Sequence, residues 1–149
     1  MPVRAGVMPT AGGQASAAQI PWGWLGYAQV TAGQGSITTA VDLTGLSVSV
    51  TVAASRRVRV SWSTRYSGSG GGMSITTKCM EGATQLQMAE AQVASNLFGL
   101  TIGGAVVLTP SAGAHTYKLQ AQGNSGTAQL VASATDPSWL LVEDLGPSS

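Results

Sequence analysis

The chain has 149 residues, and seven Lys and Arg against six Asp and Glu give it a formal net charge of +1. Only 9% of its residues are charged, whereas roughly 25% are charged in a typical soluble domain. This composition argues against an electrostatic nucleic-acid binder or a polybasic membrane-surface binder. With one His and one Cys, the chain can form neither an intrachain disulfide nor a zinc site of several Cys and His ligands.

The first segment, residues 1–21, is rich in Pro, Gly, Ala and Gln. It predicts an extended N-terminal arm ahead of a single domain over residues 22–149. The segment lacks the apolar core of a secretory signal peptide, so we expect folding in a cytoplasm, a reducing compartment that fits the free Cys79. No stretch reaches the ~18 consecutive apolar residues of a membrane-spanning helix, and we expect no membrane insertion.

From Trp22 onward, short runs rich in Val, Ile, Thr and aromatic residues alternate with Gly, Ser and Pro clusters. Their spacing predicts an all-β domain, an antiparallel jelly-roll-like β-sandwich of about 8–10 strands. Residues 83–95 contain good helix formers, but their apolar positions make a poor helical stripe and favour a strand. The predicted strands are 22–30, 36–41, 46–52, 57–66, 73–80, 84–94, 100–109, 115–122, 127–134 and 139–145.

The segment 57–66 has the clearest strand pattern. Successive side chains in a strand point to opposite faces, so one face should be core and the other should carry Arg57, Arg59 and Arg65. The arginine-bearing face is either a solvated sheet surface or a contact with another subunit or partner protein. The expected core positions of this strand are Val58, Val60, Trp62, Thr64 and Tyr66.

Trp22 and Trp24 would share one face of an extended segment. In one interpretation they anchor the arm to the core of the domain. In the other they line a subunit or partner contact, where Trp is enriched. The sequence leaves both interpretations open.

Candidate catalytic and metal-binding groups are few. His115 could act as a general base, but no convincing nucleophile motif accompanies it, and we expect a structural or surface role. Cys79 is expected to be a small buried apolar residue. Glu143 and Asp144 could contribute to a calcium site, but without a recognised loop spacing a solvated terminus is favoured. The sequence therefore predicts no catalytic, metal or cofactor-binding residue.

Four segments carry a resemblance to a known family. The closing run 141–145 (LVEDL) is a moderately specific part of the pattern, and residues 114–119 (AHTYKL) also belong to it. The chain resembles the small virion proteins of tailed phages of actinobacteria, which are usually assigned to the minor tail group. The segments are residues 26–39, 41–46, 114–119 and 132–147.

This resemblance implies a non-enzymatic virion protein without a cofactor. Its β-sandwich would form a homotrimer or similar ring, as in the tumour-necrosis-factor and complement-type jelly rolls, and the arm would dock onto other virion proteins. We expect a minor tail component, with a capsid decoration protein as the alternative. A third candidate is a carbohydrate-binding or hydrolytic tail module for a host surface glycan, for which Trp139 near Asp136 is the nearest match.

Overall fold

The computed structural model describes residues 23–69, 71–93 and 97–148. The expected arm over residues 1–21, and Trp22 with it, lie outside the described residues. Ten strands and no helix occur in the described ranges, so the all-β prediction is confirmed, and no candidate membrane-spanning helix occurs there. The strands are β1 (Gly23–Val30), β2 (Gln34–Ile37), β3 (Val41–Val52), β4 (Arg56–Ser69), β5 (Met73–Glu81), β6 (Thr84–Val93), β7 (Leu97–Leu108), β8 (Gly113–Asn124), β9 (Thr127–Leu130) and β10 (Ser138–Pro147).

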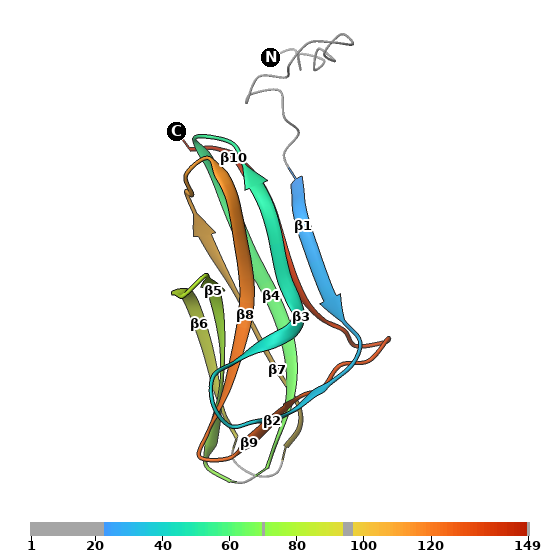
Figure 1. Ribbon diagram of the computed structural model, residues 1–149. Coiled ribbons are helices and arrows are strands. Elements are labelled where there is room, and N and C mark those ends of the chain that lie inside the picture. The colour runs from blue at the N-terminus through green and yellow to red at the C-terminus, as the bar shows by residue number, and fades with distance from the viewer. Residues whose placement is uncertain (1–22, 70, 94–96, 149) are drawn as a thin grey trace, which may run out of the picture.

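The strands form two antiparallel sheets packed face to face as a jelly-roll-like sandwich (Figure 1). The first, which we call the β4 sheet, has β4 at its centre, with β7 along one edge. The other edge of β4 pairs first with β10 and then with β9, while β1 extends the sheet beyond β10 and β2 extends it beyond β9. The second, the β8 sheet, has the order β3-β8-β5-β6.

The core lies between the sheets, and β4 supplies its inner residues as predicted. Val58, Val60, Trp62, Thr64 and Tyr66 are all buried. Because apolar side chains alternate with polar ones along β4, one face can be removed from water while the other stays at the surface. Each large aliphatic side chain fully buried in this way contributes about 1.5–3 kcal/mol.

A hydroxyl chain crosses the core between the sheets. Thr64 donates its only hydroxyl hydrogen to the carbonyl of Ile102 at 2.9 Å, so it must accept from Thr77, whose Oγ1 lies 3.3 Å away. Thr77 therefore accepts from the Tyr66 hydroxyl at 2.8 Å. Each buried hydroxyl then has a partner, which offsets the cost of removing it from water. Burial is the main reason that the pKa of Tyr66 is raised.

Several predicted strand boundaries differ from the observed ones, and two of these differences have local causes. The strand expected over residues 36–41 divides into β2, which ends at Ile37, and β3, which begins at Val41. Ser36 has a φ of 59°, and the β2–β9 pairing breaks between Gln34 and Ile37, since a left-handed residue cannot continue a regular ladder. The strand expected over 127–134 ends at Leu130.

The early end of β9 has a local cause. Ser133 donates its backbone N–H to the carbonyl of Asp136 at 3.1 Å, and its hydroxyl accepts from the backbone N–H of Asp136 at 3.1 Å. Serine hydroxyls favour turns by such bonds to nearby backbone. By contrast, the segment that could also have formed a helix is confirmed as a strand, β6.

Candidate interaction surface

The described candidate residues lie on one surface, the outer face of the β4 sheet. In the strand register, Trp24 of β1 lies opposite Glu143 of β10, which lies opposite Arg59 of β4, which lies opposite Val107 of β7. Arg57 and Arg65 occupy the same face of β4. The structure therefore brings together Trp24, Arg57, Arg59 and Arg65, whereas Trp22 is not described.

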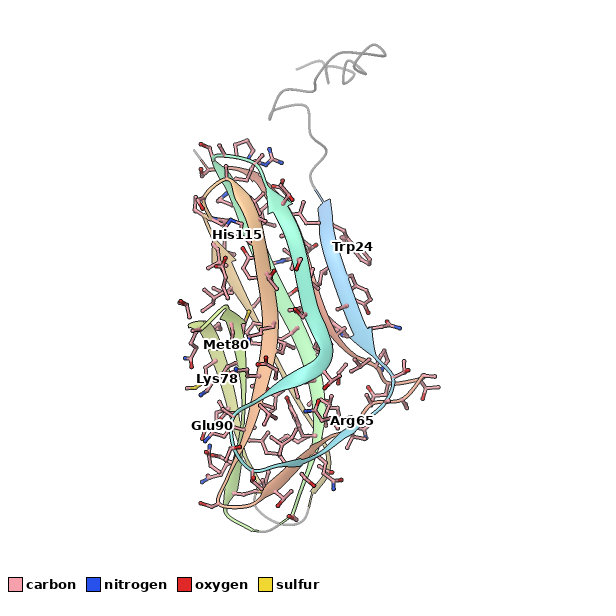
Figure 2. All side chains as sticks on the ribbon, in the orientation of Figure 1. Trp24, Arg65, Lys78, Met80, Glu90 and His115 are labelled. Carbon is pink, nitrogen blue, oxygen red and sulfur yellow. The ribbon has the colours of Figure 1, made fainter. Side chains whose placement is uncertain are left out.

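Trp24 projects from β1 and is 71% exposed (Figure 2). Its ring stacks on Tyr27, with centroids 5.6 Å apart and planes 24° apart. The interpretation in which Trp24 anchors the arm to the core is therefore wrong, because the indole remains in solvent. Tyr27 itself is 42% exposed, so both aromatic rings of the pair are accessible at the surface.

Further apolar side chains continue this surface across the sheet. Leu141 lies opposite both Tyr27 and Ser61, and Trp139 lies opposite both Gln29 and Ser63. Both apolar residues are half-buried and stand outside the hydrophobic core. Ala105 and Val107 are exposed on β7. We call these residues the apolar band, which consists of Trp24, Tyr27, Ala105, Val107, Trp139 and Leu141.

The arginines beside the apolar band are solvated or paired. Arg59 donates from Nε and Nη2 to Oε2 of Glu143 at 2.9 and 2.7 Å, and Arg65 forms an ion pair with Asp136. Arg57 is exposed and has no ion pair in the described part of the chain. Exposed pairs of this kind contribute about 0–1 kcal/mol. The face thus carries charges of both signs.

The acidic end of β10 differs from the prediction of a solvated terminus. Asp144 is buried, and its carboxylate accepts two bonds from Nε of Arg56, at 3.0 and 2.8 Å. Arg56 is also buried, whereas the adjacent Arg57 is exposed. Glu143 forms an ion pair with Arg59. In the described residues, no group of three or more His, Cys, Asp or Glu side chains could hold a metal ion.

The outer face of the β8 sheet is different in character. Asp42 accepts from Lys118 and Gln120, both at 2.8 Å, and these hydrogen bonds lower the pKa of its carboxyl. Ser49 and Thr116 share a hydrogen bond of 2.7 Å. This part of the β8 sheet carries polar side chains that hydrogen-bond one another, unlike the apolar band of the β4 sheet.

His115 and Cys79 lie away from the apolar band. Nδ1 of His115 lies 2.5 Å from Oε1 of Glu81, and Nε2 lies 2.8 Å from the carbonyl of Ser111. The bond to Glu81 is the main reason that the pKa of His115 is raised. Cys79 is buried, as predicted, and this burial raises the pKa of its thiol to about 12.

Sequence reasoning missed most of the apolar band. A signal for Trp139 and Leu141 was present, because they alternate with the buried Leu140 and Val142. Tyr27 could not be assigned by alternation, since the β1–β10 pairing shifts register between Trp24 and Gly26. Such a bulge places two residues opposite one and reverses which side chains face outward.

Comparisons with known proteins give distant similarities of fold. No protein-family model and no curated protein sequence matches the chain. The Eiger TNF of S. frugiperda is 12% identical with a TM-score of 0.48, over 83% of this chain and 94% of that one. A carbohydrate-binding module of Cellvibrio mixtus lichenase 5A, solved with cellotriose, is 20% identical with a TM-score of 0.36. The match covers 80% of this chain and 97% of that one. VP2 of infectious bursal disease virus is 8% identical with a TM-score of 0.39, and the match covers 81% of this chain and 37% of that one. At these values the similarity carries no information on function.

Proposed function

We propose that the chain is a non-enzymatic structural protein of a tailed-phage virion. In this proposal the β-sandwich assembles with copies of itself, as a homotrimer or similar ring, and the N-terminal arm attaches the assembly to other virion proteins. The resemblance of residues 114–119 and 132–147 to phage virion proteins supports this assignment, and it favours a minor tail component over a capsid decoration protein. The protein would be assembled in the cytoplasm of the host bacterium.

The observation that carries self-association is the apolar band. Trp24 and Val107 are 71% and 55% exposed at opposite sides of the same sheet face, and Trp and Tyr are enriched among residues that dominate binding energy. On β4, the small Ser61 and Ser63 lie beside Leu141 and Trp139, and short side chains there leave room for a side chain of another copy. Arg59 and Glu143 neutralise each other within one copy, so a second copy can approach this face without repulsion between these charges.

The chemistry of the reactive side chains supports a non-enzymatic role. Both ring nitrogens of His115 already face acceptors, in Glu81 and Ser111. Cys79 is buried, and with a pKa of about 12 its thiol stays protonated near neutral pH. A thiolate is the nucleophilic form of cysteine, so this side chain is poorly suited to catalysis.

Analytical ultracentrifugation of the full chain tests the self-association. We expect a trimer or ring at micromolar concentration, and roughly 10- to 100-fold weaker association for the variants Trp24→Ser and Val107→Asp. Met88→Ser is the matched control, because Met88 is 46% exposed on β6 in the other sheet. A monomeric wild-type protein, or equal association of all variants, would overturn the proposal.

Reconstruction of the virion by cryo-electron microscopy tests the location. Density for this chain at the tail supports the proposal, density on the shell lattice supports the decoration alternative, and absence from the particle contradicts both. Deletion of residues 1–21 tests the arm. We expect the truncated protein to fold and self-associate but to be missing from particles, and normal incorporation would contradict the role of the arm.

A further inference from the structure

β7 forms an open edge of the β4 sheet. Among the strands that the structure describes, it pairs with β4 alone (Figure 1). Its pairing is regular over Leu100–Leu108, because the register shift between the two strands lies before Leu100, at Tyr66 and Ser67 of β4. This run contains no proline and no charged residue. Proteins usually protect an edge strand with charges, prolines or bulges, since its unpaired backbone groups can pair with another chain.

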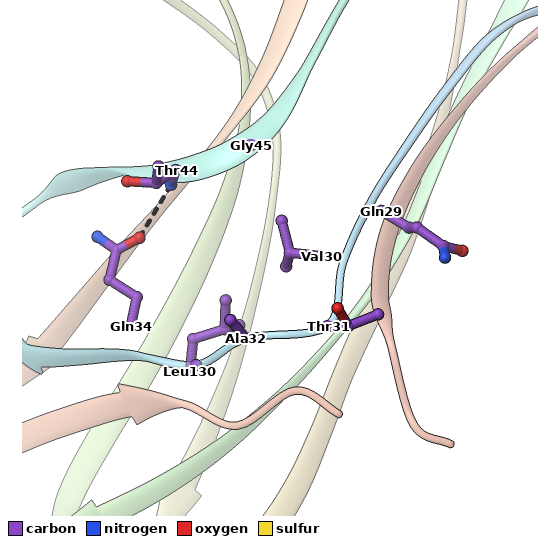
Figure 3. A pocket seen from close by; sticks show the side chains of 9 residues that line it. Gln29, Val30, Thr31, Ala32, Gln34, Thr44, Gly45 and Leu130 are labelled. Carbon is purple, nitrogen blue, oxygen red and sulfur yellow. Dashed lines mark hydrogen bonds between the residues drawn. The ribbon is translucent and has the colours of Figure 1, made fainter. Parts of the chain in front are cut away.

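The other long edge strands carry such protection. β6 has a register shift and the charged Glu90, and β1 has the bulge described above. In β3 the pairing breaks between Asp42 and Ser47, beside a cavity of about 550 Å³ that Thr44 lines. There, Oε1 of Gln34 accepts from the backbone N–H of Thr44 at 2.9 Å and occupies this donor (Figure 3). The regular run of β7 has none of these features.

The hydrogen bonds of β4 show which backbone groups of β7 face outward. Arg65 donates its N–H to Oγ of Ser138 at 3.3 Å, and its carbonyl accepts from the N–H of Val131 at 2.7 Å, so both groups point away from β7. In an antiparallel ladder both groups of a residue point to one neighbour, and successive residues alternate. Thr64 therefore exchanges its backbone bonds with Ile102, its partner in the register. The Thr64 hydroxyl also reaches the Ile102 carbonyl, at 2.9 Å.

The residues between these bonded positions carry the open groups of β7. By the same alternation, Thr101, Gly103, Ala105 and Val107 point their N–H and C=O groups away from β4. All of them are exposed, and each offers one donor and one acceptor. Ala105 and Val107 also belong to the apolar band, so the band runs up to this open edge.

The edge is complementary to a second copy of itself. If two β7 strands run antiparallel about Gly104, Thr101 lies opposite Val107, and Gly103 lies opposite Ala105. Each of these pairs exchanges two hydrogen bonds, and together they satisfy all the open groups. Gly104 lies opposite its own copy at the symmetry centre, in a pair without hydrogen bonds, where strands bring their Cα atoms closest. No side chain obstructs the approach there.

The inner face of the edge favours the same register. Leu100, Val106 and Leu108 pack against the core but are only half-buried. The register places Leu100 opposite Leu108 of the other copy, and Ile102 opposite Val106. Apolar pairs of this kind stabilise neighbouring strands. The second copy would therefore cover the part of these side chains that one copy leaves in water.

We propose that β7 pairs antiparallel with β7 of a second copy and joins the two β4 sheets into one. This contact goes beyond the proposed function, because it is made by the backbone of an edge and not by the face of the sheet. It joins copies two by two, and would link the proposed rings in pairs. One strand edge buries less surface than a standard interface, so we expect a dissociation constant on the order of 0.1 mM.

Amide hydrogen exchange measured by NMR tests the pairing. The full chain carries Trp24→Ser, which weakens the contact through the apolar band and leaves β7 unchanged. The amides of Thr101, Gly103, Ala105 and Val107 should exchange about fourfold more slowly at about 1 mM protein than at about 20 µM, as mass action requires for this dissociation constant. The amides of Ile102 and its bonded neighbours should exchange equally at both concentrations, because they donate to β4.

Variants of the edge complete the test. Ala105→Pro removes an N–H that points to the open edge, a position at which strands tolerate proline, and should abolish the concentration dependence. Thr101→Lys keeps every backbone donor but adds a charge of the kind that protects natural edges, and should have the same effect. Ala105→Ser is the matched control for Ala105→Pro, because it retains the N–H, and should leave the dependence intact.

Two results would overturn the pairing. Slow exchange of the outward-pointing amides at every concentration would mean that a segment of the same chain covers the edge. Fast exchange at every concentration would mean that the edge stays open. Neither result bears on the apolar band, because the sedimentation of Trp24→Ser against the wild type tests that contact separately.

Discussion

Arg56 at the start of β4 and Asp144 near the end of β10 form an ion pair inside the sandwich. Their side chains are 1% and 6% exposed, and Nη2 of Arg56 lies 2.7 Å from Oδ2 of Asp144. Asp144 also accepts from the backbone N–H of Gly146 at 2.8 Å. The pair therefore links the first residue of β4 to the irregular end of β10, where the register shifts between Asp144 and Gly146.

Asp144→Asn should destabilise the fold by about 3–5 kcal/mol, because the buried guanidinium would lose its countercharge. Urea unfolding at neutral pH measures the effect. Glu143→Gln is the matched control, since it removes an exposed pair one residue away and should cost at most about 1 kcal/mol. Equal losses for the two variants would contradict the assignment. The double variant Arg56→Met, Asp144→Leu should lose less stability than the sum of its single changes.

The His115 site should make stability depend on pH. Because the pKa of His115 is raised above 6.5 in the folded state, its stabilising contribution is complete below pH 6.5. This contribution is lost as the pH rises through the pKa that His115 has in the folded state. Urea midpoints should fall across this window in the wild type and stay flatter in His115→Gln. Glu81→Gln should also flatten the profile, because Glu81 is the main cause of the shift. Parallel profiles for all three proteins would rule out this linkage.

Thr77→Val tests the direction of the hydrogen bonds in the hydroxyl chain of the core. The change removes the acceptor of the Tyr66 hydroxyl and the donor to Thr64, leaving a buried polar group unpaired at a cost of about 1–3 kcal/mol. Thermal or urea unfolding measures the loss. Adding Tyr66→Phe to Thr77→Val should recover part of it, because the stranded hydroxyl is then absent. If the second change instead adds a further full loss, the hydrogen bond between these residues is not the cause.

Gly104→Ala tests the packing of β7 on the core. A Cβ at this position would lie 2.4 Å from Cζ2 of Trp62, in a ring that is 2% exposed. Overpacking of a filled core costs about 1–3 kcal/mol. Ala105→Ser, at the exposed neighbouring position, should be nearly neutral in the same unfolding assay. Trp62→Phe should relieve part of the Gly104→Ala defect, and purely additive losses would argue against a steric clash.

The sequence predicts much of the fold because alternation is a local property. In β4, every second residue from Val58 to Tyr66 is buried, and the pattern depends only on strand geometry. The burial of Cys79 is expected from its residue type, since free cysteines are among the most buried residues. These features need no knowledge of which strands become neighbours.

The remaining features depend on pairing between distant segments. Arg56 and Asp144 are 88 residues apart, and neither residue type is usually buried, so composition predicts the opposite of what occurs. Tyr27 faces outward because of a bulge in β1, and the end of β2 depends on the positive φ of Ser36. The apolar band combines three segments whose register is visible only once the sheet has formed.

The position of β10 between β1 and β4 has a consequence for folding. Among the strands that the structure describes, β1 pairs with β10 alone, and Gly23 lies opposite Asp144. Ser138–Pro147 must therefore leave the ribosome before β1 can join a sheet. Pairing across such a separation is slow because the chain loses much conformational freedom before the contact stabilises it. During synthesis, the apolar residues of β1 and β4 that face β10 in the folded sheet thus remain unpaired with it. In this period a chaperone or a second nascent chain can reach them.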